Sequence, residues 1–299
     1  MPAPCLAGPE KILFIGDSVL DRYSWDGQVH LRAGCVANLL RAASFDGNAI
    51  DLVSTFPDPE LLARLLPSGN STPGVTLFPS HGPLNFVDYA VADDGVLQVK
   101  DDPAPCPHLF DEEMAALILM GEHSVIAVAD YGLGTLGPCA KAAIRARGAS
   151  GRAEVLVDAR HANYDDYRGA SWFLPTLDEF LQYRPSETGD GRSPAWFVKE
   201  LGASGVVLKK GAGGLQVITS DGRDFELAGL PEHLVVDAFG AGDMLLGGLA
   251  TRIRREGFDQ NCFRRVLDIV FGLLQLPAAG DLARAARTSP RGAASASVV

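Results

Sequence analysis

The sequence element with the most recognisable chemistry is VVDAFGAGDMLLGGLA at residues 235–250. Three small residues, Gly240, Ala241 and Gly242, are followed by Asp243 and an apolar helical segment. Glycines let the backbone approach a ligand closely, and the N–H groups at a helix start lack intrahelical partners, so such a turn can bind an anion. Asp243 could remove a proton from an attacking hydroxyl while the amides hold phosphoryl oxygens, as phosphoryl transfer requires. The alternative is a glycine-rich turn whose aspartate only caps the helix.

Apolar runs along the chain predict the framework that would hold this turn. Patterns typical of buried strands lie at 11–16, 50–54, 124–130, 154–158, 171–174 and 206–210, with a hairpin-like pattern over 215–227. Helical spacing occurs near 35–43, 138–147, 176–182, 194–202, 242–255 and 261–274. This alternation predicts one α/β domain with a mostly parallel sheet covered on both faces. Ligands of such sheets bind beyond the carboxyl ends of the strands, where this sequence has Asp17, Asp130, Asp158 and Lys209.

Composition and charge argue against two classes of partner. The formal net charge is −11, whereas a nucleic-acid partner requires a basic surface. No apolar run reaches the ~18 residues of a membrane-spanning helix. The five cysteines form no CxxC pair and no signal peptide is evident, so we expect reduced thiols and a cytoplasmic protein.

The extended string D-x-x-G-A-G-D resembles the signature of the ribokinase-like (PfkB) carbohydrate kinases. The resemblance implies ATP and Mg²⁺ as cofactors and Asp243 as the general base. It also implies that Gly240, Ala241 and Gly242 form the anion hole, and that Asp237 lies near the nucleotide phosphates. The fold that it implies is a central, mostly parallel sheet flanked by helices, with a small β lid.

The amino-terminal run ILFIGDSVLDRY (12–23) looks like the opening of the bacterial heptose-7-phosphate kinases of this family. By that resemblance Asp17 and Asp21 accept hydrogen bonds from sugar hydroxyls; alternatively, the run is a strand followed by a helix cap. The segment Gly34 to Asn38 resembles a Gly-Gly-x-x-Asn element in which Asn38 binds sugar, with one glycine missing here. Asn38 could instead only cap a helix.

Three segments of the middle of the chain, 129–136, 155–180 and 206–217, resemble heptose-kinase segments in order and spacing. The resemblance implies that Glu179 orients Mg²⁺ through water and that Arg160 stands where the family has lysine. It further implies that Gly211 and Gly213 allow close approach to the nucleotide. Lys209 would bind its phosphates, unless it and Lys210 are a solvated strand end.

Several departures from the family pattern bear on the substrate. Thr176 replaces an asparagine, Leu133 replaces a lysine, and Asp88 stands near the position of a basic pair that could hold a substrate phosphate. The stretch between Tyr23 and Gly34 is short, which predicts a trimmed lid. Strands at 75–78, 86–91 and 96–99 remain as lid candidates, the last two as a hairpin around 92–95.

These observations predict a kinase domain over residues 8–285 and a disordered tail over 286–299. The expected activity is ATP-dependent phosphoryl transfer to a hydroxyl of a sugar or of a sugar phosphate such as a heptose 7-phosphate. One alternative is a nucleoside or unphosphorylated-sugar kinase of the same fold. Another is a pseudokinase that binds ligands but turns over poorly. The expected partners are small molecules, and a homodimer is considered because lids of this family often pair subunits.

Overall fold

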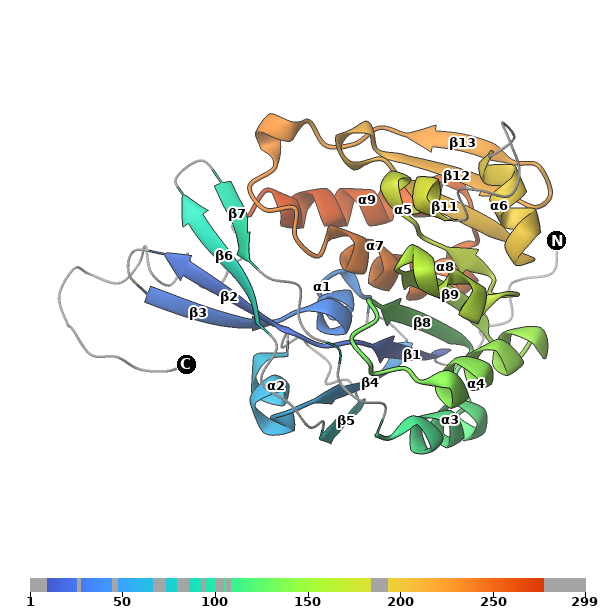
Figure 1. Cartoon of the computed structure of the whole chain (residues 1–299). Coiled ribbons are helices and arrows are strands. Elements are labelled where there is room, and N and C mark those ends of the chain that lie inside the picture. The colour runs from blue at the N-terminus through green and yellow to red at the C-terminus, as the bar shows by residue number, and fades with distance from the viewer. Residues whose placement is uncertain are drawn as a thin grey trace.

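A nine-stranded sheet forms the centre of the molecule (Figure 1). The computed structural model describes residues 10–25, 28–44, 48–66, 74–79, 86–92, 95–100, 105, 109–183 and 193–276. In spatial order the strands are β13 (Asp224–Leu227), β12 (Leu215–Thr219), β11 (Gly205–Lys209), β10 (Trp172–Phe173), β9 (Glu154–Ala159), β8 (Val125–Asp130), β1 (Glu10–Gly16), β4 (Asn48–Phe56) and β5 (Gly74–Pro79). All neighbours from β11 to β5 are parallel, and β12 and β13 continue the sheet antiparallel.

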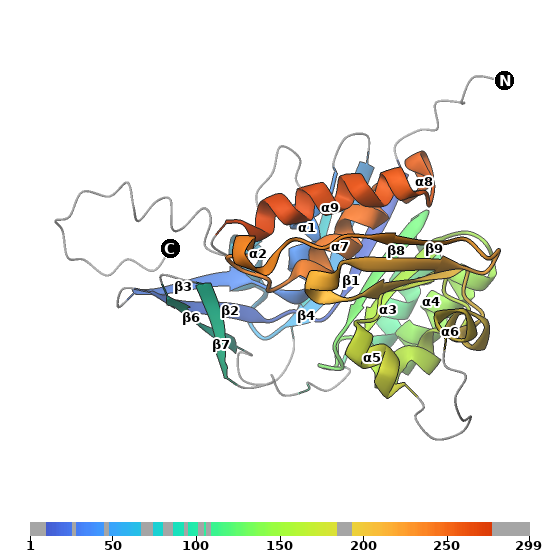
Figure 2. The same ribbon diagram turned by 90° about the horizontal axis from the view of Figure 1, so that it is seen from above.

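Helices cover both faces of this sheet, as Figure 2 shows. One face carries α1 (Leu39–Ala42), α7 (Ala241–Ala250) and α9 (Gln260–Leu274), and the other carries α3 (Asp111–Met120), α4 (Pro138–Ala149) and α6 (Pro194–Leu201). Shorter helices are α2 (Pro59–Leu65), α5 (Leu177–Gln182) and α8 (Ile253–Glu256). Every residue of β8 is buried, as expected for a parallel strand covered on both sides. The predicted α/β class is confirmed.

A second sheet of four strands projects beyond the carboxyl end of β1 and forms the lid (Figure 1). Its order is β3 (Gln28–Ala33), β2 (Leu20–Trp25), β6 (Phe86–Ala92) and β7 (Gly95–Lys100). β2 pairs parallel with β6, and the other two pairs are antiparallel. The predicted hairpin of 86–91 and 96–99 is confirmed.

Two expectations about the lid were wrong. The segment 75–78 lies in β5, which pairs parallel with β4 at the edge of the large sheet. The short stretch before Gly34, expected to be trimmed, supplies two lid strands because β2 and β3 pair tightly from Leu20↔Ala33 to Trp25↔Gln28. A hairpin this compact needs few residues, so shortness of the segment does not remove the strands.

The predicted helices need small changes at their ends. The run 35–43 begins as a 3-10 turn, Cys35–Asn38, before α1, and 242–255 is divided into α7 and α8. Cys35, Cys139 and Cys262 are free thiols, whereas Cys5 and Cys106 lie outside the described residues, as do both ends of the predicted domain and the predicted tail. Within the described ranges, no helix combines the length and apolarity needed to cross a bilayer.

Candidate active site

The glycine-rich turn begins α7 at the edge of the sheet where the parallel strands end. Gly240 precedes the helix with φ of 77°, a left-handed conformation that glycine adopts at little cost. Asp243 lies in the first turn of α7 and is 5% exposed. The residues predicted as anion hole and base therefore share one helix start, where backbone N–H groups and the helix dipole favour negative charge.

The carboxylate of Asp243 is held by two side chains from distant parts of the chain. Asn38 donates from Nδ2 to Oδ2 at 3.1 Å, and the Tyr131 hydroxyl donates to Oδ1 at 2.5 Å. Burial raises the pKa of Asp243 from 3.8 to about 7; Asp158 adds to the rise, while the bonds from Tyr131 and Asn38 and the charge of Lys209 oppose it. A carboxylate with a pKa near neutrality suits a general base.

Sequence reasoning missed Tyr131 as a partner of Asp243. It follows β8 directly, so it stands at the carboxyl end of a central strand. The signal was the polar pair Asp130-Tyr131 after an apolar run, a position where ligands of parallel sheets bind.

A buried ion pair lies beside the turn. Lys209 Nζ is 2.6 Å from Asp158 Oδ2, and their side chains are 14% and 2% exposed. A Cβ on Gly242 would lie 3.0 Å from each of these two atoms. The absence of a side chain at Gly242 thus lets the cation of Lys209 approach the backbone of the turn.

A cavity of about 750 Å³ lies beside the turn. It is lined largely by apolar side chains of α9 and of the segment 229–239, together with Lys209, Gly211, Ala241 and Gly242. This size and character suit a ligand with a flat apolar part and a polar end. Of the residues predicted on the nucleotide side, Gly213 is not among the lining residues.

Asp237 also does not line the cavity, although it was predicted near the nucleotide phosphates. Its carboxylate is 4% exposed and accepts a hydrogen bond from the Phe239 amide at 2.9 Å. Burial raises its pKa, and the charge of Arg32 in the lid opposes this rise. The structure therefore places Asp237 toward the lid.

The two carboxylates predicted to bind sugar are engaged within the protein. Asp17 accepts three hydrogen bonds from backbone N–H groups of the loop after β8. Asp21 accepts two bonds from the buried guanidinium of Arg32, at 2.9 and 3.1 Å. Gly34 packs on Asp21, since a Cβ there would lie 2.6 Å from Oδ1.

Two further residues predicted on the sugar side, Asn38 and Arg160, differ in their surroundings. Asn38 is 3% exposed, and its Oδ1 has no hydrogen-bond partner among the described residues. Arg160 is exposed. Burial and the negative charge of Asp243 raise the pKa of the Cys35 thiol, and the positive charge of Arg160 lowers it. Cys35 itself has φ of 50°, the conformation that the family's missing glycine would adopt easily.

Thr176 and Glu179 form a reciprocal cap at the start of α5. The Thr176 hydroxyl accepts from the Glu179 amide at 3.2 Å, and Glu179 Oε2 accepts from the Thr176 amide at 2.8 Å. Thr176 therefore caps α5. In the described part of the chain, no group of three or more His, Cys, Asp or Glu side chains is placed to hold a metal ion.

Aromatic rings line the inner face of the lid. Tyr23 stacks on Tyr89 with ring centroids 4.7 Å apart, and Tyr89 contacts Phe239 at 4.5 Å. Leu133 is buried in the same cluster. On the outer face, Asp88 pairs with Arg22 through bonds of 2.5 and 2.6 Å, so Asp88 points away from this cluster.

Known proteins resemble this chain in sequence and in fold. Residues 122–267 match the family described as pfkB family carbohydrate kinase. A D-beta-D-heptose 7-phosphate kinase from Bordetella bronchiseptica is 24% identical over 265 residues, which cover 80% of this chain and 83% of that protein. The bifunctional protein HldE of Methylococcus capsulatus is 24% identical over 274 residues, which cover 81% of this chain and 56% of that protein. The chain thus spans little more than half of the bifunctional relative.

Among solved structures, Arabidopsis thaliana ribokinase complexed with ribose and ATP has a TM-score of 0.65 to this chain at 16% identity. The match covers 90% of this chain and 94% of the ribokinase. The comparisons confirm the ribokinase-like fold and the resemblance to the pfkB family carbohydrate kinases, and they support a sugar kinase.

Proposed function

We propose that this protein transfers the γ-phosphoryl group of ATP to a hydroxyl of a sugar or sugar phosphate, with Asp243 as the general base. The observation that carries the proposal is the position of Asp243 at the start of α7, directly after Gly240–Gly242. As phosphorus approaches, Asp243 takes the hydroxyl proton while the backbone amides of the turn stabilise charge on the phosphoryl oxygens. The lid then serves to exclude water, which would otherwise compete with the acceptor.

The cavity beside the turn fits the nucleotide. Its volume of about 750 Å³ and its apolar walls suit a purine base, and its polar end is formed by Gly242 and Lys209. The ribokinase of similar fold was solved with ATP, which supports the same ligand here. We propose that Lys209 approaches the phosphates and that Gly211 borders the nucleotide.

For Mg²⁺ the fit rests on two carboxylates, Asp158 and Glu179, whose charges interact. One or two carboxylates are typical of magnesium held mainly by waters and substrate phosphates. The ion would neutralise negative charge on the transferring group. We propose that Glu179 holds it through water, using the carboxylate that also caps α5.

The test is the Asp243→Asn variant, assayed with ATP and a panel of sugars and sugar phosphates. Turnover should fall by about 100-fold or more, the usual size of a general-base effect. Asp224→Asn, an exposed change in β13, is the matched control and should keep wild-type turnover. Near-normal turnover of Asp243→Asn would exclude Asp243 as the base. Calorimetric ATP binding with no transfer by the wild type would favour a pseudokinase.

A second candidate is an acceptor without a phosphate, such as a nucleoside or a plain sugar. It is favoured because two lid arginines, Arg22 and Arg32, are each paired with an aspartate, and because Leu133 packs in the aromatic cluster where the family has a cation. ATP consumption with heptose 7-phosphate but with no unphosphorylated acceptor would exclude this candidate.

A further inference from the structure

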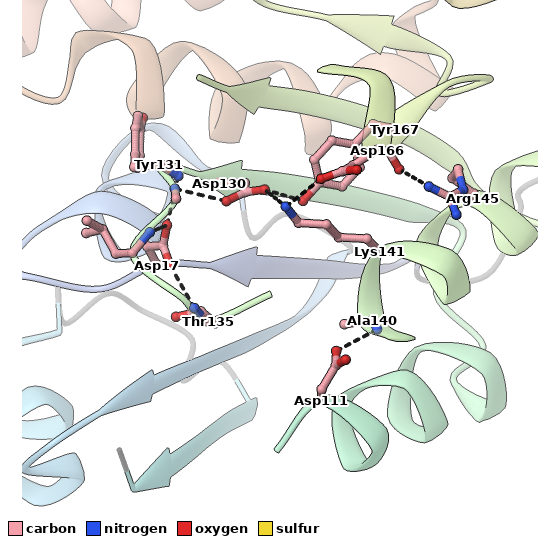
Figure 3. Close-up of polar contacts among 12 residues, drawn as sticks. Asp17, Asp111, Asp130, Tyr131, Thr135, Ala140, Lys141, Arg145, Asp166 and Tyr167 are labelled. Carbon is pink, nitrogen blue, oxygen red and sulfur yellow. Dashed lines mark hydrogen bonds and ion pairs between the residues drawn. The ribbon is translucent and has the colours of Figure 1, made fainter. Parts of the chain in front are cut away.

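Both ends of Tyr131 are fixed. Its backbone amide donates to Asp17 Oδ2 at 2.8 Å, while its hydroxyl donates to Asp243 Oδ1 at 2.5 Å (Figure 3 shows the Asp17 side). The residue thus bridges the end of β1 to the start of α7. The backbone anchor is open to any residue type, whereas the bond to Asp243 requires the tyrosine hydroxyl.

Asp17 organises the whole loop after β8. Besides the Tyr131 amide it accepts from the Leu133 amide at 3.1 Å and from the Thr135 amide at 3.1 Å (Figure 3). Asp17 is 1% exposed, and burial raises its pKa. A carboxylate that accepts several backbone bonds holds those amides in one arrangement, so its role here is to fix the loop.

Asp130, at the end of β8, also holds this loop. It accepts from the Gly132 amide at 3.0 Å and from the Tyr167 hydroxyl at 2.7 Å, and Lys141 Nζ lies 2.9 Å from its Oδ2 (Figure 3). Lys141 also bonds Asp166 at 2.9 Å. The residue before Tyr131 is therefore held by three separate groups.

We propose that Tyr131 is a positioning residue for the base: its hydroxyl orients the Asp243 carboxylate and stabilises its ionised form, and the loop fixed by Asp17 holds the tyrosine in place. This inference rests on the proposed function of Asp243. A hydrogen bond to the charged form of a carboxylate stabilises that form. The bond thereby keeps a deeply buried acid ionised at the pH where it must accept a proton.

Four other groups near Asp243 are polar or titratable, and they too bear on the charge state of its carboxylate. They are Asn38 from the 3-10 turn, Asp158 at the end of β9, Lys209 at the end of β11, and the thiol of Cys35. Asn38 and Lys209 also favour the ionised form, and Asp158 opposes it. Among the groups that lower the pKa of Asp243, Tyr131 has the largest effect.

The experiment compares the pH profiles of kcat for the wild type, Tyr131→Phe and Tyr164→Phe. Tyr164 is the matched control because it is fully buried and its hydroxyl has no hydrogen-bond partner among the described residues. Tyr131→Phe should move the midpoint of the acid limb upward by about one pH unit, since one hydrogen bond to a charged group is lost. Tyr164→Phe should leave the midpoint in place. A uniform loss of kcat in Tyr131→Phe, with an unmoved midpoint, would overturn the proposal.

A second variant tests the role of the loop. Asp17→Asn replaces one of the two carboxylate oxygens with an NH2 group, which donates and cannot accept, so the three amides can no longer all be bonded. The loosened loop should shift the midpoint in the same direction as Tyr131→Phe. The two shifts should not add in the double variant, because both act through the same hydroxyl. Additive shifts would contradict the assigned role of Asp17.

Direct titration separates this inference from the proposed function. Carboxyl carbons of ¹³C-labelled aspartate are followed by NMR without turnover, and the Asp243 signal is assigned by its loss in Asp243→Asn. A higher titration midpoint in Tyr131→Phe supports the inference even if no acceptor is phosphorylated. An unchanged midpoint in an active kinase overturns the inference and leaves the function intact.

Discussion

The side chain of Asn38 fills the space that a side chain on Gly240 would occupy. A Cβ on Gly240 would lie 2.6 Å from Asn38 Nδ2, the same nitrogen that donates to Asp243. The glycine turn and the asparagine that holds Asp243 are thus in direct contact, although about two hundred residues separate them in sequence.

Gly240→Ala should therefore impair both stability and turnover. The new Cβ meets Asn38, and alanine is strained at φ of 77° by roughly 1–2 kcal/mol. Displacement of Asn38 also removes a bond to Asp243. Urea denaturation and kcat measure the two effects; Gly151→Ala, also at positive φ but with open space around it, is the control for backbone strain alone. Equal stability and equal kcat in the two variants would contradict the Asn38 contact.

Asp243 should reduce the stability of the protein as the pH rises. Its pKa is about 7 in the folded state and 3.8 ordinarily, so the folded state binds the proton more tightly between these values. Stability linked to this group is complete below pH 3.8 and falls until about pH 7. Asp243→Asn, which carries no charge, should gain about 2–4 kcal/mol over the wild type at pH 8 but little at pH 4. Thermal unfolding across this pH range checks the difference, and a constant difference at all pH values would count against it.

Cys35 should carry backbone strain. A non-glycine residue at φ of 50° lowers the free energy of unfolding by roughly 1–2 kcal/mol. Glycine avoids this strain but loses more conformational entropy on folding, so only part of the stability is regained. Cys35→Gly should be more stable than Cys35→Ala by about 0.5–1 kcal/mol, both variants lacking the thiol. Urea unfolding measures the gap; an alanine variant that is the more stable one would argue against strain.

The pair of Lys209 and Asp158 should tolerate double replacement better than single replacement. Lys209→Met leaves the buried Asp158 charge without its 2.6 Å partner and should cost about 3–5 kcal/mol. Adding Asp158→Leu removes that charge and should recover part of the loss. Chemical denaturation of the wild type, Lys209→Met, Asp158→Leu and the double variant forms the cycle. A double variant less stable than Lys209→Met would show that the charge is not the cause.

The fold and the helix start that carries Asp243 were predictable from sequence because their signals are local. Apolar runs ending at polar residues located β1, β8 and β9, and the string from Asp237 to Asp243 located the start of α7. The short hairpin of β2 and β3 was missed because its strands mix apolar residues with charged ones such as Asp21, Arg22 and Arg32, a weaker signal than a continuous apolar run.

The partners of the candidate residues were not predictable. Asp17 and Asp21 have the types expected of sugar ligands, yet their oxygens are bonded by the loop after β8 and by Arg32. Tyr131 meets Asp243 across 112 positions of sequence. Residue type and spacing along one segment carry no information about which distant segment will supply the opposing donor, since tertiary packing sets that contact.

Phe239 lies between the cavity and the lid. It lines the large cavity beside α7, and its ring packs on Tyr89 of the lid. If a molecule bound under the lid displaces this ring, the displacement also changes the shape of the cavity, next to Gly240 at the start of the turn. Linkage then requires reciprocity: the factor by which one ligand changes the affinity of the other through Phe239 is the same in both directions.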